Sequence, residues 1–245
     1  MFNSFKKFTI LYYALVLVFM STVLFDLPLL HYTVKPMFMI VLMVFHWKQL
    51  SGLSSFFSKT IQFGLFFSWI GDIALMFDEK IPILFVVGLG AFLIAHMGYA
   101  AAFMRNVKDS KAAFNFPKAA LMALPFILIT GAFFYYMKDG LQADLFIPVL
   151  AYTVVISVMG ITAAARHNHV DDKSYNWILI GGILFILSDM VIAINKFVID
   201  FDYDAILNMA LYLTGQFMIT VGAIFYAKDL KRQRNIRPTN YTVNQ

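Results

Sequence analysis

Long hydrophobic runs alternate with short polar stretches along this chain. Runs of about 17–25 apolar residues can cross a bilayer as helices, and eight stretches are candidates. They are Phe8–Phe25, Val34–Trp47, Thr60–Phe77, Ile81–Met104, Ala119–Met137, Leu145–Ala165, Trp177–Asn195 and Leu207–Ala227. The second run is short, and Pro36 suits the first turn of its helix. The alternatives are an earlier start near Leu29 and a tilted or re-entrant segment. The pattern predicts an all-α fold, a polytopic membrane helix bundle with eight transmembrane helices.

Charges between the runs predict how the chain is oriented. Of the 19 Lys and Arg residues, 15 fall in segments on the side of the N-terminus. The other side holds four, namely Lys35, Lys80, Lys138 and Lys196. Because cytoplasmic loops are enriched in Lys and Arg, both termini are expected in the cytoplasm, and eight spans satisfy this where seven would not.

The loops are short, so we expect a single transmembrane domain over residues 1–231 and no obligate protein partner. Residues 232–245 are polar and are predicted to form a disordered, basic cytoplasmic tail. Its arginines are expected to meet anionic lipid headgroups.

Composition supports the membrane class. Hydrophobic residues make up 61% of the chain and charged residues 13%, whereas soluble domains are nearer half apolar and a quarter charged. The net charge of +5 lies in loops and the tail, where it orients a membrane protein and does not indicate nucleic acid. We expect an integral protein of the bacterial inner membrane. The chain has no cysteine, which excludes disulfides, a thiolate nucleophile and cysteine-ligated metal.

Two aspartates interrupt apolar runs: Asp72 in FFSWIGDIALMF and Asp189 in LFILSDMVIAINKF. A mid-membrane aspartate costs about 2.5–3.5 kcal/mol on insertion scales, so two of them suggest a functional pair. Both lie in spans that run the same way, roughly 18 Å from the inner boundary by the helical rise. Equal depth is what a shared site requires. The likeness of the two spans also hints at a parallel 4+4 repeat, for which chance similarity is the alternative.

Other polar side chains reach the depth of the aspartates. They are His96, Tyr99, Tyr152, Tyr212 and Gln216, with Ser188 directly before Asp189 and Lys35 at an outer helix end. Because unpaired polar groups are costly in hydrocarbon, they should face the bundle interior. The structural alternative is that they link helices by hydrogen bonds, with His96 a core histidine and Lys35 an interfacial lysine.

Two kinds of hydrolase fit the residues poorly. A membrane zinc hydrolase usually needs several histidines at bilayer depth, and only His96 qualifies, since His167 and His169 fall in a predicted solvated loop. A serine hydrolase needs an activated serine, and Ser188 is not in a G-x-S-x-G elbow. We therefore expect no metal and no cofactor, and the two carboxylates indicate acid–base chemistry.

Several motifs in order resemble the YhhN-like lysoplasmalogenases, eight-span membrane proteins of bacteria and animals. The resemblance is carried by Lys35-Pro36, by Gly71-Asp72 in GDIALM, by Gly88, Phe92, His96 and Tyr99 in GLGAFLIAHMGY, by Tyr152, by Phe185, Ser188 and Asp189 in LFILSDMVIAINKF, and by Tyr212 and Gln216 in YLTGQ. It implies hydrolysis of the vinyl ether bond of a lysoplasmalogen to a fatty aldehyde and glycerophosphoethanolamine or glycerophosphocholine. It also implies that Asp72 and Asp189 are catalytic.

The residues suit that chemistry. Protonation of a vinyl ether gives an oxocarbenium ion, the same electronic problem that two carboxyl groups solve in glycosidases. Burial and a like-charged neighbour both disfavour ionisation, so one aspartate should stay neutral as the acid. His96 or Tyr99 would steer water, and Lys35 would hold the phosphate of the lysophospholipid. The alternatives are a proton-coupled transporter or a binder of a lipid or amphiphile, because buried carboxylates also serve proton relays.

Overall fold

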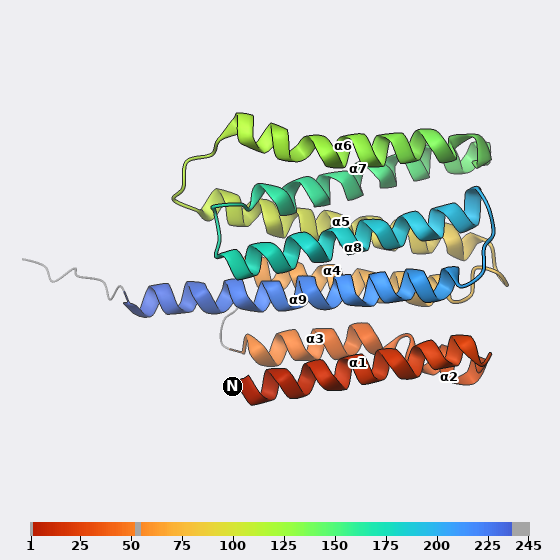
Figure 1. Ribbon diagram of the computed structural model, residues 1–245, viewed down its shortest axis with the longest axis horizontal. Helices are drawn as coiled ribbons and strands as arrows, with labels where there is room; N and C mark the ends of the chain where they lie inside the picture. Colours follow the sequence, from red (N-terminus) through yellow and green to blue (C-terminus); the bar gives the residue numbers. More distant parts are fainter. Residues whose placement is uncertain (1, 52–54, 237–245) are drawn as a thin grey trace, which may run out of the picture.

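The computed structural model describes residues 2–51 and 55–236, and these residues form helices and no strand (Figure 1). The helices are α1 (Phe2–Leu24), α2 (Pro28–Val34), α3 (Met37–Gln49), α4 (Phe56–Leu75), α5 (Ile83–Asp109), α6 (Phe116–Met137), the 3₁₀ helix η1 (Lys138–Gly140), α7 (Ala143–Ala165), α8 (Asp172–Phe197) and α9 (Asp204–Ile236). The all-α prediction is confirmed for this part of the chain.

The helices run along one another from end to end of a bundle. α1 begins and α9 ends at the same end, which we call the N-terminal end, and the opposite end is called the far end (Figure 1). α2 and α3 follow each other and form a single stretch, Pro28–Gln49. The second predicted run therefore starts near Leu29, the earlier of its possible starts. α9 continues five residues into the stretch 232–245, whose residues 237–245 lie outside the described residues.

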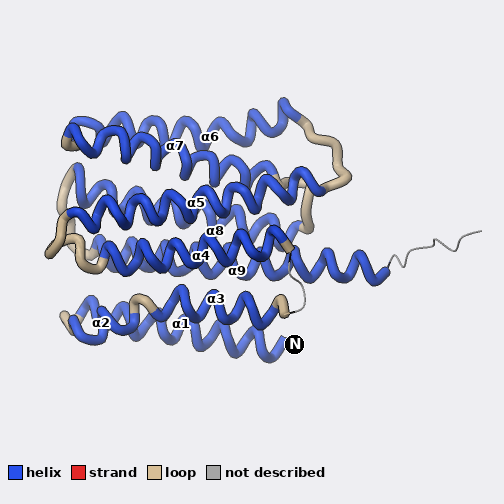
Figure 2. Tube along the Cα trace, turned by 180° about the vertical axis from the view of Figure 1, so that it is seen from behind, coloured by secondary structure: helices blue, strands red, loops and turns tan. Residues whose placement is uncertain are grey.

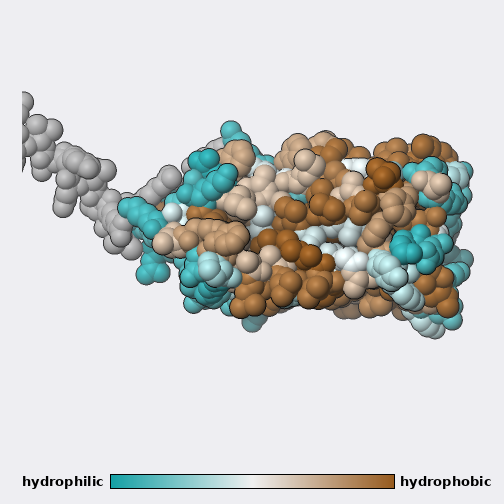
Figure 3. Space-filling view, turned by 90° about the horizontal axis from the view of Figure 1, so that it is seen from above, coloured by the Kyte–Doolittle hydropathy of each residue, from teal (hydrophilic) through white to brown (hydrophobic). Residues whose placement is uncertain are grey.

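Seven stretches of the described chain are long and apolar enough to cross a membrane, and α4 is not among them. α4 carries Lys59, Gln62 and Asp72 in 20 residues, which lowers its hydropathy, yet it runs beside α5 within the bundle (Figure 2). The face over α6 is hydrophobic in the middle and hydrophilic towards both ends, as expected of a protein that lies in a bilayer (Figure 3). A helical membrane bundle is thus confirmed, and the eighth span stays a prediction.

Polar residues fix where several helices begin. Ser55 accepts a hydrogen bond from the Ser58 amide at 3.1 Å, and Asn115 accepts one from the Lys118 amide at 3.0 Å. Asp171 does the same for α8 through the Ser174 amide at 2.9 Å. Each side chain satisfies an amide that has no partner within its helix, which stabilises the start of α4, α6 or α8 by about 1 kcal/mol.

Small residues let two helix pairs approach closely. On α8 and α9, a Cβ atom added to Gly181 would lie 2.8 Å from the Gly215 carbonyl oxygen, so the two backbones are in contact. On α4 and α5, a Cβ atom on Gly71 would lie 2.6 Å from the ring of Phe92. Such contacts are how membrane helices pack without a hydrophobic driving force between them. The two pairs follow one another at the same place in each half of the chain, and the 4+4 repeat stays a prediction.

A buried arginine joins three helices at the N-terminal end. Arg166, which follows α7, is fully buried, and its Nε donates to Asn106 Oδ1 on α5 at 2.9 Å. Its terminal nitrogens donate to the carbonyl and hydroxyl oxygens of Ser174 on α8, at 3.2 and 2.6 Å. The sequence places Arg166 among the orienting charges, whereas the structure places it inside the bundle as a link between helices.

Gly181→Ala should destabilise the protein because the added methyl group must push the α8 and α9 backbones apart. Overpacking of this kind costs about 1–3 kcal/mol. Thermal unfolding of the purified protein in detergent should show a lower midpoint. Gly90→Ala is the matched control: a Cβ atom there meets nothing within 4 Å, so its midpoint should be unchanged or higher. Equal midpoints for the two variants would contradict the close α8–α9 contact.

Candidate active site

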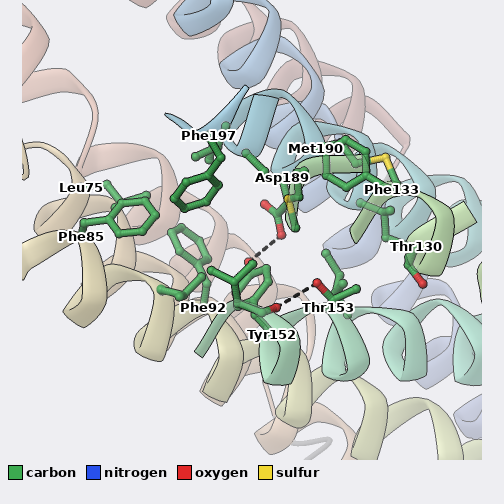
Figure 4. Close-up of a pocket in the computed structure, with 17 residues that line it drawn as sticks. Leu75, Phe85, Phe92, Thr130, Phe133, Tyr152, Thr153, Asp189, Met190 and Phe197 are labelled. Atoms are coloured by element: carbon green, nitrogen blue, oxygen red, sulfur yellow. Dashed lines mark hydrogen bonds between the residues drawn. The ribbon is translucent and has the colours of Figure 1, made fainter. Parts of the chain in front are cut away.

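A cavity lies in the half of the bundle nearer the far end, between α5, α6, α7 and α8 (Figure 4). About 680 Å³ of space not filled by atoms lies in the cavity and at its opening, part of it open to the surroundings. Its walls are apolar except for Thr130, Tyr152, Thr153 and Asp189. A mainly apolar cavity with a few convergent polar groups is the usual composition of a small-molecule site.

Asp189 is the one carboxylate among the residues that line this cavity. The Tyr152 hydroxyl, from α7, donates a hydrogen bond to Asp189 Oδ2 at 2.5 Å, and Figure 4 shows the two side chains meeting across the cavity. His96 Nε2, from α5, lies 3.8 Å from the same oxygen. The His96 ring is fully buried, and neither of its nitrogens has a hydrogen-bond partner among the described residues. A buried histidine beside a carboxylate is therefore available to bind a further polar group.

Asp72 belongs to a second polar cluster, formed by α4, α5 and α9. It is 3% exposed, and its Oδ2 accepts a hydrogen bond from the Tyr212 hydroxyl at 2.9 Å. Lys35, between α2 and α3, interacts electrostatically with Asp72. Next to this pair, Gln216 accepts from the Tyr99 hydroxyl at 2.7 Å and donates to Ser68 Oγ at 2.9 Å. These side chains satisfy one another, as buried polar groups must.

Aromatic rings lie between the two clusters. The Phe92 ring lines the cavity and meets the rings of Phe185 and Tyr212 edge-on, with centroids 6.1 and 5.8 Å apart. Phe185 in turn lies edge-on to His96 at 4.6 Å. Both phenylalanine rings thus pack against Tyr212, which binds Asp72. Phe185 also packs against His96, which lies beside Asp189. We call these two phenylalanine rings the ring layer.

The two aspartates occupy matching positions along parallel helices. Asp72 is residue 17 of α4 and Asp189 is residue 18 of α8, and both helices run from the N-terminal end to the far end (Figure 1). α4 packs on α5 and α9, and α8 packs on α9 and α7. The carboxylates are therefore at similar heights, with Asp189 at the cavity and Asp72 behind the ring layer.

The remaining predicted residues are placed as follows. Ser188 is fully buried and donates to Asn208 Oδ1 on α9 at 2.6 Å; it is not among the residues that line the cavity. His167 lies 3.0 Å from Lys118 Nζ, and burial together with His167 lowers the pKa of His169. Within the described residues, no three His, Cys, Asp or Glu side chains are grouped so as to hold a metal ion.

Sequence reasoning missed the residues at the mouth of the cavity. The Phe85 and Phe197 rings meet edge-on at 5.8 Å, and both line the cavity near the far end. Lys196 Nζ lies 4.9 Å from the centre of the Phe85 ring and donates to Asp78 Oδ2 at 3.0 Å. Lys196 entered the sequence argument only as an orienting charge. Its position next to an aromatic residue at the end of the Asp189 helix is the signal that was available.

These features define the protein as an all-helical integral membrane protein with a carboxylate in the wall of an apolar interior cavity. The model of the YhhN family matches residues 30–223, and the chain belongs to that family.

Several relatives carry a function in their names. The chain is 30% identical to lysoplasmalogenase TMEM86A of Bos taurus over 66% of this chain and 63% of that protein. It is 30% identical to lysoplasmalogenase TMEM86A of Homo sapiens over 70% of this chain and 68% of that protein. A bacterial relative, the lysoplasmalogenase of Mycobacterium bovis, is 29% identical over 58% of this chain and 51% of that protein. The chain thus matches about half to two thirds of the length of these relatives. No solved structure matches the chain.

Gln216→Leu should destabilise the protein because it removes the acceptor of the buried Tyr99 hydroxyl and the donor to Ser68 Oγ. An unsatisfied buried polar group costs about 1–3 kcal/mol, and thermal unfolding in detergent should detect the loss. In Gln216→Leu combined with Tyr99→Phe and Ser68→Ala, the orphaned groups are gone and part of the lost stability should return. A triple variant less stable than Gln216→Leu would contradict the hydrogen-bond network.

Proposed function

We propose that the protein is an intramembrane hydrolase that cleaves the vinyl ether bond of lysoplasmalogens. The products are a fatty aldehyde and glycerophosphoethanolamine or glycerophosphocholine. The observation that carries the proposal is Asp189, whose carboxyl group lies in the wall of an otherwise apolar cavity between Tyr152 and His96. The lysoplasmalogenase names of the relatives support the same activity.

The reaction begins with proton transfer from a carboxylic acid to the vinyl carbon remote from the ether oxygen. The resulting oxocarbenium ion takes up water at the carbon next to that oxygen, and the hemiacetal collapses to aldehyde and alcohol as the carbon–oxygen bond breaks. We assign the proton donor to Asp189, because it is the carboxyl group that borders the cavity. The Tyr152 bond occupies Oδ2 and leaves Oδ1 to carry the proton.

After donating its proton, Asp189 is a carboxylate that can take a proton from the attacking water. His96 is proposed to orient this water, because its ring nitrogens are buried, lack partners and adjoin Asp189. Asp72 supplies the second negative charge, which stabilises the cation across the ring layer. Lys35 interacts electrostatically with Asp72 and the Tyr212 hydroxyl donates a hydrogen bond to it, so a charge on Asp72 has partners. Fixed charges in an apolar site act strongly on the cation because little water screens them.

The phosphate of the substrate should lie at the far end, because two lysines lie there. One is near Asp72 and the other is near the cavity. Lys35 was predicted for this role, and it interacts electrostatically with Asp72 and Asp78. Lys196 lies over the mouth itself, against Phe85, and is bound to Asp78. Either ammonium group can bind a phosphate as a point charge.

We also propose that α4 is the eighth span and that both termini are cytoplasmic. α4 contains 20 residues, enough for about 30 Å of helix, and lies within the bundle. Its polar residues Ser68 and Asp72 are buried against α5 and α9, so they need not face lipid.

Asp189→Asn and Asp72→Asn should both lose activity. Removal of a general acid lowers kcat by about 100-fold or more, and we expect this for Asp189→Asn. Loss of a fixed charge that stabilises the transition state should lower kcat at least about tenfold in Asp72→Asn. The measurement is aldehyde release from a 1-alkenyl lysophospholipid by purified protein in detergent.

Asp139→Asn is the matched control for these variants, because Asp139 is exposed at the far end and should be fully active. In heavy water, the aldehyde should carry one deuterium on the carbon next to the carbonyl. Retained turnover in either of the first two variants would exclude the two-aspartate mechanism. Proton-dependent flux of the lipid in liposomes without any product would favour a transporter.

Single cysteines can test the topology, since the natural chain has none. Glu79→Cys between α4 and α5 should react with a membrane-impermeant maleimide added to intact cells. Ala113→Cys between α5 and α6 should react only after the cells are opened. Both positions are exposed, so accessibility within the fold is matched. The reverse pattern would contradict the proposed topology. Ser51→Cys, exposed between α3 and α4, should also react only after the cells are opened, and labelling of Ser51→Cys and Glu79→Cys from the same side would exclude α4 as a span.

A further inference from the structure

α6 is loosely held in the bundle compared with the helices that carry the aspartates. Among its 22 residues only Thr130 and Met137 are buried, and it has a proline, Pro125, in its interior. Its main neighbour is α7, and its contact with α8 is short. α6 also forms one wall of the cavity, through Thr130, Phe133 and Met137. The cavity is therefore separated from surrounding lipid on this side by a single, lightly packed helix.

A groove lies between α6 and α8, beside the cavity. Its lining residues are Pro125, Phe126, Ile129 and Thr130 of α6 and Ile183, Ile186 and Leu187 of α8. Thr130 and Ile186 line both spaces, so the groove adjoins the cavity on the side of the N-terminal end. We call it the α6–α8 groove.

The α6–α8 groove offers nothing to a polar ligand. Its one hydroxyl, on Thr130, donates to the Phe126 carbonyl oxygen at 2.7 Å within its own helix. Ile129, Ile183 and Leu187 are 55%, 38% and 42% exposed, so they face the side where lipid would be. An apolar ligand that enters from the bilayer is the kind of occupant that these walls favour.

The interior route past the cavity is closed. At Gly160 on α7, an added Cβ atom would lie 2.6 Å from the Phe126 ring and 2.9 Å from Ile186 Cδ1. Phe126 and Ile186 thus fill the space where α6, α7 and α8 meet. A long ligand held at Asp189 cannot extend further between these three helices, and two sideways exits remain, between α6 and α8 and between α6 and α7. The exit between α6 and α7 carries the hydroxyls of Thr130, Thr153 and Ser157, whereas the α6–α8 groove has that of Thr130 alone and suits an alkyl chain better.

We propose that the hydrocarbon chain of a single-chain lipid lies in the α6–α8 groove and leaves it into the bilayer. The inference rests on the proposed hydrolysis, because it places the reacting bond at Asp189. Ile183 is six residues from Asp189 on α8, or about 9 Å, which is shorter than an extended long alkyl chain. The groove therefore accepts alkyl chains of different lengths, because the end of a long chain extends into the bilayer. The aldehyde product leaves directly into lipid.

Leu187→Trp should narrow the groove and discriminate between chain lengths. A hexadecenyl lysophospholipid must pass the new indole ring, whereas a butenyl analogue ends near the cavity. Relative to the natural protein, kcat/KM for the hexadecenyl substrate should fall about tenfold more than kcat/KM for the butenyl substrate. A difference of this size is typical of discrimination by shape in an apolar pocket.

Leu150→Trp is the matched control. Leu150 is 36% exposed and lines a different groove, between α6 and α7, which also adjoins the cavity at Thr130 and Thr153. Its kinetics should be unchanged for both substrates. A chain-length effect in Leu150→Trp and none in Leu187→Trp would overturn the proposal and place the chain between α6 and α7.

A binding measurement separates this proposal from the activity. A saturated 1-alkyl lysophosphoethanolamine lacks the vinyl ether and carries a diazirine on its chain. On irradiation it should label residues 129–130 and 183–187, as mapped by mass spectrometry. Labelling there without hydrolysis of the alkenyl lipid would support binding of the chain in the α6–α8 groove and refute the proposed hydrolysis. Hydrolysis with labelling confined to other helices would refute binding of the chain in this groove and support the proposed hydrolysis.

Discussion

Each of the two membrane-depth carboxylates accepts a hydrogen bond from a tyrosine on another helix. Tyr212 of α9 binds Asp72 of α4, and Tyr152 of α7 binds Asp189 of α8. In hydrocarbon there is no water to replace such a partner, so each bond fixes which helices must be neighbours. The bundle is arranged so that five helices with polar residues, α4, α5, α7, α8 and α9, enclose these pairs, while α6 and the outer helices face lipid.

The two pairs differ in surroundings, and this difference is the basis of the separate roles that we propose for them. Asp189 borders an apolar cavity and has a buried histidine without partners beside it. Asp72 lies behind the ring layer, with Lys35 within electrostatic range. Two identical side chains at similar height are thus placed in one neutral and one positively charged environment. That separation is how a protein obtains an acid and an anion from the same residue type.

Much of the architecture follows from the sequence because it depends on local properties. The apolar runs are long enough for each to predict a crossing. Pro28 and Pro36 mark the starts of α2 and α3, into which the second crossing is divided. Of the polar residues predicted to face inward, His96, Tyr99, Ser188 and Gln216 are fully buried, whereas Lys35 and Tyr152 are half-buried. α4 does not meet the hydropathy criterion because Lys59, Gln62 and Asp72 together reduce its apolar character, and of these only Asp72 belongs to the candidate site.

The relative placement of the two aspartates could not be predicted, because it depends on which helices are neighbours. Depth along a helix is encoded locally, but the insertion of Phe92 and Phe185 between Asp72 and Asp189 results from packing across four helices. The same is true of Lys196, which is an ordinary loop charge in sequence, whereas its ammonium group lies 4.9 Å from the centre of the Phe85 ring that lines the cavity. Ser188 is the opposite case: it is next to Asp189 in sequence, but its hydroxyl donates to Asn208 and it does not line the cavity.

The last helix has a practical consequence for experimental structure determination. α9 contains 33 residues and is therefore about 50 Å long, whereas the hydrocarbon layer is about 30 Å thick. It runs past the other helices at the N-terminal end (Figure 1). A chain of 27.9 kDa is a small target for electron cryomicroscopy. Joining a rigid helical partner in frame to this continuous helix would hold both at a fixed angle and provide a mass outside the micelle for particle alignment.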